Sequence, residues 1–512
     1  MNGAEAIIRT AREAGIEVCF ANPGTTELPL VAALDSVGGI RSVLGLTEAV
    51  CTGAADGYAR MSGRPAMALL HLGPGFANGI SNLHNARRGS SPVVTVVGEH
   101  ATWHRAFDPP LAMDIEALAR TVSGWQCTCG SAGLLGQEMA EAALAACRGQ
   151  VATLIVPYDL QLEPSRAGAI APPPGRREPV SPEALESAAA LLRGGGKSAL
   201  VLGGGGLGRA GLMNAARIRR ACGCDLLAEG RPARVERGAG LPDARRIPYL
   251  PEAGIEMLAP YGAFVFAGAE EPVSFFGYPG VPGKLIPEDR KRIPLAGRGD
   301  DVAEALGLLA DALGAPPNPA AEGLSRPNRP ALPAGALNGD KACAVVAALQ
   351  PEGAIVVEEA VTSGRKYYAL TAGVPPCSLL TLTGGSLGQG PPCAAGAAVA
   401  CPERPVINIQ ADGAGMYSFP ALWTEAKEGL NVTTLICANR GYNILKMEMG
   451  RLGVSAPGAN ALRLTDLGGI DWVALGRGMG VPSARAATAE ELASELGRAL
   501  GEPGPHLIEM VM

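Results

Sequence analysis

Short, uniformly apolar runs recur along this chain of 512 residues and alternate with alanine-rich segments of helical spacing. Residues 93–99 read VVTVVGE, residues 263–267 read AFVFA and residues 432–438 read VTTLICA. These runs lack the alternation of a half-exposed strand and are typical of strands covered on both faces. Such strands, separated by helices, predict α/β domains with parallel sheets. In these sheets, ligands bind beyond the carboxyl ends of the strands.

Two proline-rich, charge-bearing stretches divide the chain. They cover residues 163–183 and 315–338, and both have the composition of surface linkers. Between them we expect three domains, at residues 1–165, 183–314 and 338–512. Apolar residues make up 47% of the chain, enough to build a core in each segment. The sequence therefore predicts three α/β domains, each a mostly parallel sheet flanked by helices.

The charge and the cysteine content argue against several classes of protein. A formal net charge of −6, without a long basic run, disfavours a nucleic-acid-binding protein. No uncharged apolar run is long enough to span a membrane, and residues 1–18 have the periodicity of an amphipathic helix rather than of a signal peptide. The 12 cysteines are scattered, so we interpret them as ordinary reduced thiols of a cytoplasmic protein.

Two strand ends in the last segment carry residues suited to a charged ligand. Asp412 and Gly413 follow the apolar run VINIQ, and Asn439 follows VTTLICA, with Gly441 two residues further on. If the two strands are neighbours, a carboxylate, an amide oxygen and a backbone carbonyl come together. Such hard oxygen ligands suit Mg²⁺, and the glycine after the acid would let a diphosphate approach the backbone. The same residues also fit a turn acid and a helix cap, and the segment alone leaves both interpretations open.

Several motifs together resemble those of thiamine-diphosphate-dependent 2-oxo acid decarboxylases and acetolactate synthases. The residues at 411–441 are similar to the family's cofactor motif, written GDG…NN, except at Ala411 and Ala438, which supply no metal ligand in that pattern. The pattern E-A-x-x-x-G-x-A-D-G-Y-A at residues 48–59 is similar to its catalytic-glutamate helix. The stretches ANPGTTELPL and LLHLGPGFANGISNLHNA resemble its active-site loops. The resemblance is closest to benzoylformate decarboxylases and then to acetolactate synthases.

The resemblance implies a site for thiamine diphosphate and Mg²⁺. Glu48, which alone would fit charge compensation at a helix N-terminus, would contact the aminopyrimidine ring and activate the cofactor. Asn78 would lie near that ring, and Gly385 would offer it a backbone carbonyl. Leu387 would hold the cofactor bent, although its residue type also suits the core. The implied diphosphate and metal residues are Asp412, Gly413, Ala414, Asn439 and Gly441, with Asp412, Asn439 and Gly441 as metal ligands.

The same resemblance places Thr25 and His71 at substrate-contacting positions. His71 becomes a candidate for proton transfer or for orienting a carboxylate, although it also fits a hydrogen-bonded strand-end histidine, and Thr25 also fits a turn hydroxyl. The decarboxylases have a second catalytic histidine in the central domain, where this chain has Phe275, Phe276 and Tyr278. Decarboxylation and carboligation therefore both stay open.

The middle segment contains a second glycine motif. G-x-G-x-x-G occurs at Gly206, Gly208 and Gly211, and Glu229 ends a later strand-like run. This arrangement is typical of dinucleotide sites and supports an NAD- or flavin-binding oxidoreductase as an alternative function. The central domain of the resembled family opens in a similar way, often without a nucleotide. Some members bind FAD there, but this chain is shorter than the typical FAD-bearing synthases.

We therefore expect an enzyme that decarboxylates a small 2-oxo acid with thiamine diphosphate and Mg²⁺. The enamine would be protonated to release an aldehyde, or it would attack a second carbonyl and form a C–C bond. Glu48 and Asp412 lie in different domains, and in the family their shared site lies between subunits. We expect a homodimer or homotetramer with active sites between subunits. A non-catalytic homologue that binds the cofactor is a third alternative.

Overall fold

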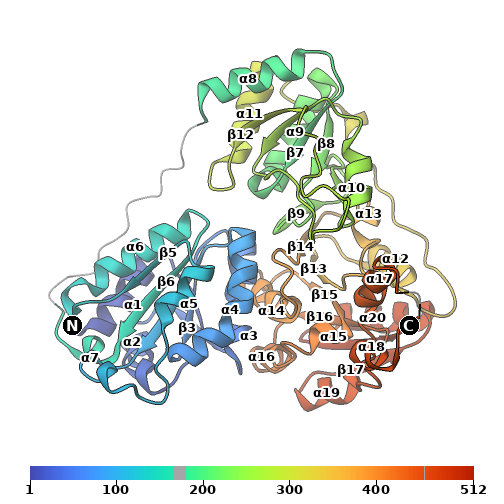
Figure 1. The fold of residues 1–512 in the computed structure, drawn as a ribbon. Coiled ribbons are helices and arrows are strands. Elements are labelled where there is room, and N and C mark those ends of the chain that lie inside the picture. Colours follow the sequence, from blue (N-terminus) through green and yellow to red (C-terminus); the bar gives the residue numbers. More distant parts are fainter. Residues whose placement is uncertain (166–179, 455) are drawn as a thin grey trace.

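Three mostly parallel sheets, each flanked by helices, make up the computed structural model (Figure 1). The structure describes residues 1–165, 180–454 and 456–512. Most of the first proline-rich stretch lies outside the described residues. The expected α/β architecture is confirmed, and each apolar run quoted above forms a buried strand. Among the described residues, no helix combines the length and the apolar character needed to cross a membrane.

The first sheet has six parallel strands in the order β2-β1-β3-β4-β6-β5. Its central strands are buried along their whole length because helices cover both faces. The strands are β1 (Val18–Asn22), β2 (Arg41–Leu44), β3 (Ala66–Leu70), β4 (Val93–Glu99), β5 (Trp125–Thr128) and β6 (Val151–Pro157). The helices are α1 (Gly3–Glu13), η1 (Thr25–Glu27), α2 (Leu28–Val37), α3 (Glu48–Ser62), α4 (Leu72–Gly89), η2 (Arg105–Phe107), α5 (Ile115–Val122), η3 (Ala132–Leu134), α6 (Leu135–Cys147) and α7 (Tyr158–Leu162).

The second sheet has five parallel strands in the order β10-β8-β7-β11-β12. The strands are β7 (Ser198–Leu202), β8 (Asp225–Ala228), β10 (Arg245–Arg246), β11 (Ala263–Ala267) and β12 (Lys291–Ala296). The helices are α8 (Pro182–Arg193), η4 (Gly204–Leu207), α9 (Arg209–Cys222), α10 (Pro251–Leu258), α11 (Val302–Ala312) and η5 (Ala321–Gly323). Figure 1 shows this unit above the other two.

The third sheet has seven strands in the order β17-β18-β16-β15-β13-β14-β9. Its edge strand β9 (Arg234–Arg237) comes from the middle of the chain and pairs antiparallel with β14. The middle segment is therefore tied to the last sheet by main-chain hydrogen bonds. The other strands are β13 (Ile355–Glu359), β14 (Cys377–Thr381), β15 (Val406–Ala411), β16 (Val432–Ala438), β17 (Ser483–Ala486) and β18 (His506–Val511). The helices are α12 (Gly339–Leu349), α13 (Tyr367–Leu370), α14 (Gly390–Ala400), α15 (Asp412–Gly415), α16 (Ala421–Glu428), α17 (Asn443–Arg451), α18 (Ala459–Thr465), α19 (Trp472–Gly478) and α20 (Ala489–Gly501).

Helices α3 and α14 join the first and last domains through one continuous apolar core (Figure 1). Both helices are rich in small residues, which lets their backbones approach closely. A Cβ on Gly57 would overlap the backbone of Cys393, and a Cβ on Gly396 would overlap the backbone of Ala54. The close crossing fixes the start of α3 and the loop before α14 relative to each other. These two places carry the expected pyrimidine residues.

Candidate functional site

The Asp412 turn lies where β15 and β16 end side by side. The two strands pair in parallel, and Ala411 is in register with Cys437. The Asp412 carboxylate is 4% exposed and accepts hydrogen bonds from the main-chain N–H of Gly413 at 2.8 Å and of Arg440 at 2.7 Å. Burial raises the pKa of Asp412, and these N–H groups partly oppose the rise. Within the described residues, no basic side chain pairs with this acid.

Asn439 and Gly441 complete the expected set of oxygen ligands. The Asn439 side-chain oxygen accepts from the Gly441 N–H at 3.1 Å, and the Gly441 carbonyl accepts from the Asn443 N–H at 2.9 Å. Each oxygen keeps a second lone pair. Arg440, between them, has a φ of +58°, a left-handed conformation that is uncommon outside glycine. A buried, uncompensated carboxylate at the end of β15 and two such oxygens just after the adjoining end of β16 are the types of donor that Mg²⁺ prefers.

The residues around Asp412 are small because the turn is tightly packed. A Cβ on Gly413 would come within 2.5 Å of the Tyr442 ring and 2.9 Å of Leu467. Ala414 is buried. Ala411, where the resembled motif has glycine, has an extended backbone with φ −80° and ψ 145°. That conformation suits any L-residue, so the alanine places no strain on the turn.

The loop before α14 contains Gly385 and Leu387, and buried polar groups hold it rigidly. Gly385 has a φ of +79°, which favours glycine. The Glu359 carboxylate accepts from the N–H groups of Gly388 at 2.6 Å and Gly390 at 2.5 Å. Glu359 is thus a buried anchor of the loop, and burial raises its pKa. Leu387 is half-buried in the loop.

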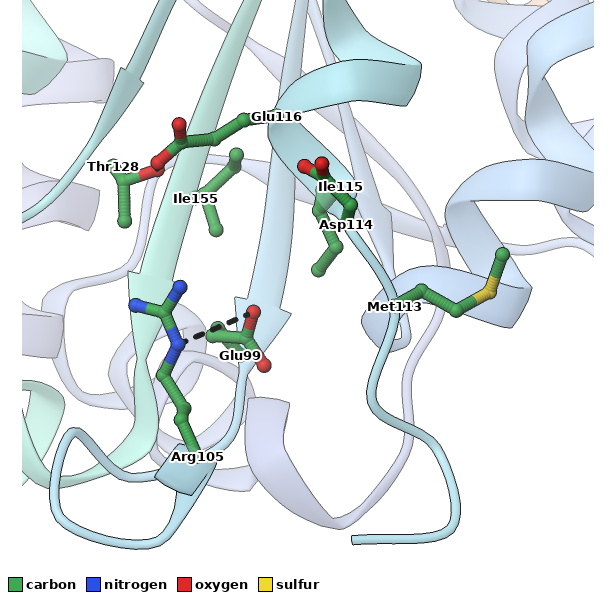
Figure 2. A pocket seen from close by; sticks show the side chains of 8 residues that line it. All are labelled: Glu99, Arg105, Met113, Asp114, Ile115, Glu116, Thr128 and Ile155. Carbon is green, nitrogen blue, oxygen red and sulfur yellow. Dashed lines mark hydrogen bonds and ion pairs between the residues drawn. The ribbon is translucent and has the colours of Figure 1, made fainter. Parts of the chain in front are cut away.

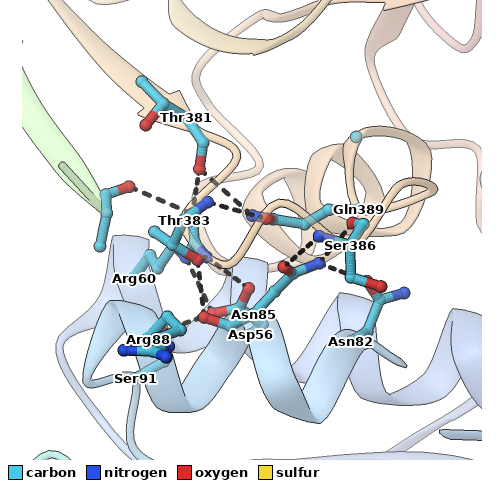
Figure 3. Close-up of polar contacts among 12 residues, drawn as sticks. Asp56, Arg60, Asn82, Asn85, Arg88, Ser91, Thr381, Thr383, Ser386 and Gln389 are labelled. Atoms are coloured by element: carbon cyan, nitrogen blue, oxygen red, sulfur yellow. Dashed lines mark hydrogen bonds and ion pairs between the residues drawn. The ribbon is translucent and has the colours of Figure 1, made fainter. Parts of the chain in front are cut away.

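Two asparagines of α4 hold the same loop from the first domain (Figure 3). Asn85 donates to the Ser386 carbonyl at 2.8 Å and accepts from the Ser386 N–H at 3.2 Å. Asn82 donates to the Gly388 carbonyl at 3.4 Å. Next to them, the fully buried Arg60 and Asp56 form an ion pair at 2.7 Å, and Arg60 reaches across to the last domain. The position of the loop therefore depends on both domains.

Glu48 is the first residue of α3, and Thr47 caps the helix. Asn78 donates to the Glu48 carboxylate at 3.2 Å, so the structure brings these two predicted residues together. Gly75 faces the same carboxylate, and a Cβ there would lie 2.9 Å from Oε1. Within the described part of one chain, no hydrogen bond joins Glu48 to the Asp412 turn.

His71 lies at the end of β3 and pairs with a buried acid that the sequence analysis missed. Its Nδ1 is 2.7 Å from the Glu27 carboxylate and 3.3 Å from the Thr26 hydroxyl. Glu27 is completely buried and also accepts from the Gly24 N–H at 2.7 Å. Thr25, predicted as a substrate contact, makes no hydrogen bond through its side chain among the described residues. The sequence did contain a signal for this pair, because Glu27 and His71 each come shortly after a strand, β1 and β3. Strands of one parallel sheet end at a common edge, so residues that follow two neighbouring strands lie close together.

A cavity of about 300 Å³ lies further along this edge, beyond β4, β5 and β6 (Figure 2). Glu99 ends β4 and points into the cavity, with Arg105 at 3.9 Å. The volume of the cavity is at the lower end of the range for small-molecule pockets. The eight residues that line it are Glu99, Arg105, Met113, Asp114, Ile115, Glu116, Thr128 and Ile155.

In the glycine turn of the central domain, the acid expected to bind a ligand is already paired with an arginine of the same domain. Arg298 pairs with Glu229 at 2.5 Å, and Glu229 also accepts from the Gly204 N–H at 3.4 Å. Burial raises the pKa of Glu229 to about 7, against the lowering effect of Arg298. A Cβ on Gly203 would overlap the Gly268 carbonyl, so two strand ends pack tightly here. The acid expected to bind a ribose is already occupied, which disfavours the dinucleotide interpretation.

The aromatic residues that stand in place of the second histidine contact the last domain. The Tyr278 hydroxyl is 3.2 Å from the Glu448 carboxylate of α17. Phe275 stacks edge-on against Phe276 at 4.5 Å and reaches Gly385, where a Cβ would lie 2.8 Å from its ring. The patch thus lies against the loop expected to hold the pyrimidine.

The class of protein follows from the models that match the two outer domains. Residues 1–118 match the N-terminal TPP binding domain of the thiamine pyrophosphate enzymes, and residues 365–510 match their C-terminal TPP binding domain. The chain therefore belongs to the thiamine pyrophosphate enzyme family and is an enzyme that depends on thiamine diphosphate.

Similar proteins indicate which type of thiamine-diphosphate-dependent enzyme this chain is. The chain is 47% identical over 518 residues to the Mycobacterium tuberculosis protein named "Putative acetolactate synthase large subunit IlvX", covering 100% of this chain and 99% of that protein. It is 31% identical to benzoylformate decarboxylase of Pseudomonas aeruginosa, over 98% of this chain and 96% of that one. A 4-hydroxybenzoylformate decarboxylase of Rhodococcus jostii RHA1 shares the fold, with a TM-score of 0.85 at 24% identity over 100% of this chain and 99% of that chain. The chain is thus of the acetolactate synthase and benzoylformate decarboxylase type.

Proposed function

We propose that this enzyme uses thiamine diphosphate and Mg²⁺ to decarboxylate a small 2-oxo acid, and that it protonates the resulting acyl fragment or joins it to a second carbonyl compound. The observation that carries the proposal is the buried Asp412 carboxylate, which pairs with no basic side chain among the described residues and accepts from the Arg440 N–H, next to Asn439 in the chain. A buried charge is costly unless a counter-charge compensates it, and a bound Mg²⁺ would supply one. Thiamine diphosphate, when bound, supplies a carbanion for attack on the ketone carbon and an electron sink for the loss of CO₂.

The metal and diphosphate would be held at the strand ends of the last sheet. Asp412, the Asn439 side chain and the Gly441 carbonyl would bind Mg²⁺ and leave its other positions to phosphate oxygens and water. Gly413 and Ala414, which directly follow Asp412, would lie beside the diphosphate. The rigid loop that Glu359 anchors would present the Gly385 carbonyl, with Leu387 beside it.

Glu48 would hold and exchange the proton at the aminopyrimidine. Its place at the start of α3, with the Asn78 amide at 3.2 Å, supports this role because the amide fixes the direction of the carboxylate. His71 would move protons at the substrate. Its Nδ1 is engaged by Glu27, so Nε2 is the nitrogen left to meet a ligand. Thr25 is exposed in the turn after β1, near Glu27, and its hydroxyl would contact the substrate.

The assembly proposed is a homodimer or homotetramer with its active sites between subunits. Each chain carries Glu48 at one face and the Asp412 turn at another, and no hydrogen bond joins them within the described part of one chain. Two chains would bring Glu48 of one to the Asp412 turn of the other. A closed symmetric pair would form two such sites at once.

The test is a substrate panel. The purified enzyme, with thiamine diphosphate and Mg²⁺, is incubated with aliphatic and aromatic 2-oxo acids, and CO₂, aldehyde and ligated hydroxyketone products are measured separately. We expect CO₂ release from at least one acid, dependent on both the cofactor and Mg²⁺. Release of aldehyde alone would define a decarboxylase, and a ligated product would define a carboligase. No cofactor-dependent CO₂ from any acid would contradict the proposal.

A further inference from the structure

Two Cys-x-Cys pairs lie in the described part of the chain, and the proposed reaction uses neither of them. Cys127 belongs to the edge strand β5 and Cys129 follows it, whereas Cys222 and Cys224 flank the turn between α9 and β8. All four side chains are free thiols. The two pairs share one spacing but differ in their surroundings, so each serves as a reference for the other.

A glycine brings the thiols of the second pair together. Cys222 is the last residue of α9, Gly223 has a φ of +73°, and Cys224 directly precedes β8. Glycine adopts this left-handed conformation without strain, and the turn lets the Cys224 thiol hydrogen-bond to the Cys222 sulfur. The Cys222 thiol in turn donates to the Ile218 carbonyl at 3.2 Å. The two sulfurs are therefore direct neighbours.

The two sulfurs of this pair differ in access and in acidity. Cys222 is half-buried, and Cys224 is buried. The hydrogen bond from Cys224 lowers the pKa of Cys222 to about 7, with help from the main-chain N–H groups of both cysteines and against the effect of burial. The same hydrogen bond, together with burial, raises the pKa of Cys224. The accessible thiol is thus the acidic one, and its partner keeps its proton.

The first pair differs from the second in both respects. The thiols of Cys127 and Cys129 each hydrogen-bond to the Glu138 carboxylate of α6. Burial and this acid raise the pKa of Cys127 to about 11, and they also raise the pKa of Cys129. A carboxylate beside both sulfurs opposes thiolate formation, so we expect this pair to stay unreactive.

An accessible thiolate in contact with a second thiol is the arrangement that hydroperoxides oxidise selectively. A pKa of about 7 leaves about half of Cys222 as thiolate at pH 7, against a few per cent of an ordinary cysteine. The sulfenic acid formed by the first attack would meet the Cys224 thiol before a second peroxide could oxidise it further. The contact between the sulfurs would therefore protect Cys222 from irreversible oxidation.

We propose that Cys222 is a peroxide-reactive thiol and that Cys224 resolves its oxidised form to a reversible disulfide. The first step is Cys222–S⁻ + H₂O₂ + H⁺ → Cys222–SOH + H₂O, in which the O–O bond breaks and the sulfur is oxidised. The second step is Cys222–SOH + HS–Cys224 → Cys222–S–S–Cys224 + H₂O, in which the S–S bond forms and the hydroxyl group leaves as water. Hydroperoxide is the oxidant, and a dithiol reductant restores both thiols.

The pair lies away from the edge of the sheet at which ligands are expected. Cys224 precedes the amino end of β8, whereas ligands of a parallel sheet bind beyond the carboxyl ends of the strands. Oxidation of the pair can therefore be followed without turnover, whether or not the proposed function holds.

The test treats the holoenzyme with hydrogen peroxide at pH 7, alkylates the remaining thiols and maps the peptides by mass spectrometry. The tryptic peptide of residues 221–234 contains both thiols of the second pair, so the disulfide appears there as the loss of two hydrogen atoms. We expect this loss before any change at Cys127, Cys129 or the exposed Cys147. Dithiothreitol should reverse it. The rate of oxidation should rise through about pH 7 and then level off, as Cys222 becomes fully thiolate.

Two variants separate the roles of the two thiols. Cys224→Ser should leave Cys222 as a sulfenic acid, which dimedone traps and which excess peroxide drives to the sulfinic acid. Cys222→Ser should lower the oxidation of the peptide at least about 10-fold, because the remaining thiol is buried and protonated. Cys127→Ser is the matched control from the first pair, and it should leave the oxidation of residues 221–234 unchanged.

Three results would overturn the proposal. The first is oxidation of Cys127, Cys129 or Cys147 ahead of the second pair in the wild-type enzyme. The second is a Cys224→Ser variant in which Cys222 stays a thiol, and the third is a disulfide from Cys222 to any cysteine other than Cys224. Thermal unfolding checks that each variant is folded, and the wild-type peptide map decides the matter even if a variant is not.

Discussion

Two glycine turns follow a strand in the same way in the described part of the chain, and there only one of them leaves its acid without a charged partner. In the central domain, Glu229 is held by Arg298 at 2.5 Å and by the Gly204 N–H. In the last domain, Asp412 is buried, and the hydrogen bonds that its carboxylate accepts from described residues come from main-chain N–H groups. The comparison teaches that the glycine pattern alone does not define a ligand site. What distinguishes the two turns is whether the chain supplies the counter-charge itself.

The largest effect is expected from a substitution of Glu48. The Asp412 turn contributes to catalysis only if a proton-exchanging group acts on the same cofactor. Glu48→Gln should lower kcat by about 1,000-fold, since an amide cannot exchange the proton. Cofactor affinity, measured by fluorescence titration, should stay within a few-fold of the wild type. Turnover near the wild-type level would exclude Glu48 from the proposed role.

The two turns themselves can be compared by one pair of matched substitutions. Asp412→Asn should weaken binding of thiamine diphosphate in the presence of Mg²⁺ by about 100-fold, because the charge that would hold the metal is removed. Glu229→Gln alters a buried acid of the other turn and should leave that affinity unchanged. Equal losses in the two variants would mean that the turns do not differ as described. The readout is a titration of apoprotein with the cofactor at fixed Mg²⁺.

A smaller effect is expected from the acid that orients His71. Glu27→Gln should lower kcat by about 10-fold, because the imidazole is no longer fixed by a charged partner. In a His71→Ala background the same substitution should have no further effect on kcat, since its action passes through the histidine. Additive losses would instead assign Glu27 a purely structural role. Glu27→Asp, which keeps the charge, should retain more activity than Glu27→Gln.

The sequence was informative wherever one local signal decided the structure. Uniformly apolar runs predicted the buried strands, and the ends of two such runs correctly placed Asp412 next to the Asn439 segment. The family and the dependence on thiamine diphosphate were also predicted from motifs and are confirmed.

Features that depend on packing between distant segments were not predictable. The strand β9 leaves the middle segment for the last sheet, and a four-residue polar strand has too weak a pattern to reveal its partner. The hydrogen bonds by which the buried Glu359 carboxylate anchors the Gly385 loop are a second such feature.

The central claim is that Glu48 and Asp412 of two different subunits serve one cofactor. The most direct test mixes Glu48→Gln and Asp412→Asn chains after mild dissociation and reassembly, at a cofactor concentration that fills the wild-type site but not the Asp412→Asn site, so that each variant has little activity alone. Random pairing makes half of the dimers mixed, and each mixed dimer has one site with both native residues, so about a quarter of wild-type activity should return. Failure to recover activity, with mixed dimers confirmed by mass spectrometry, would contradict the claim.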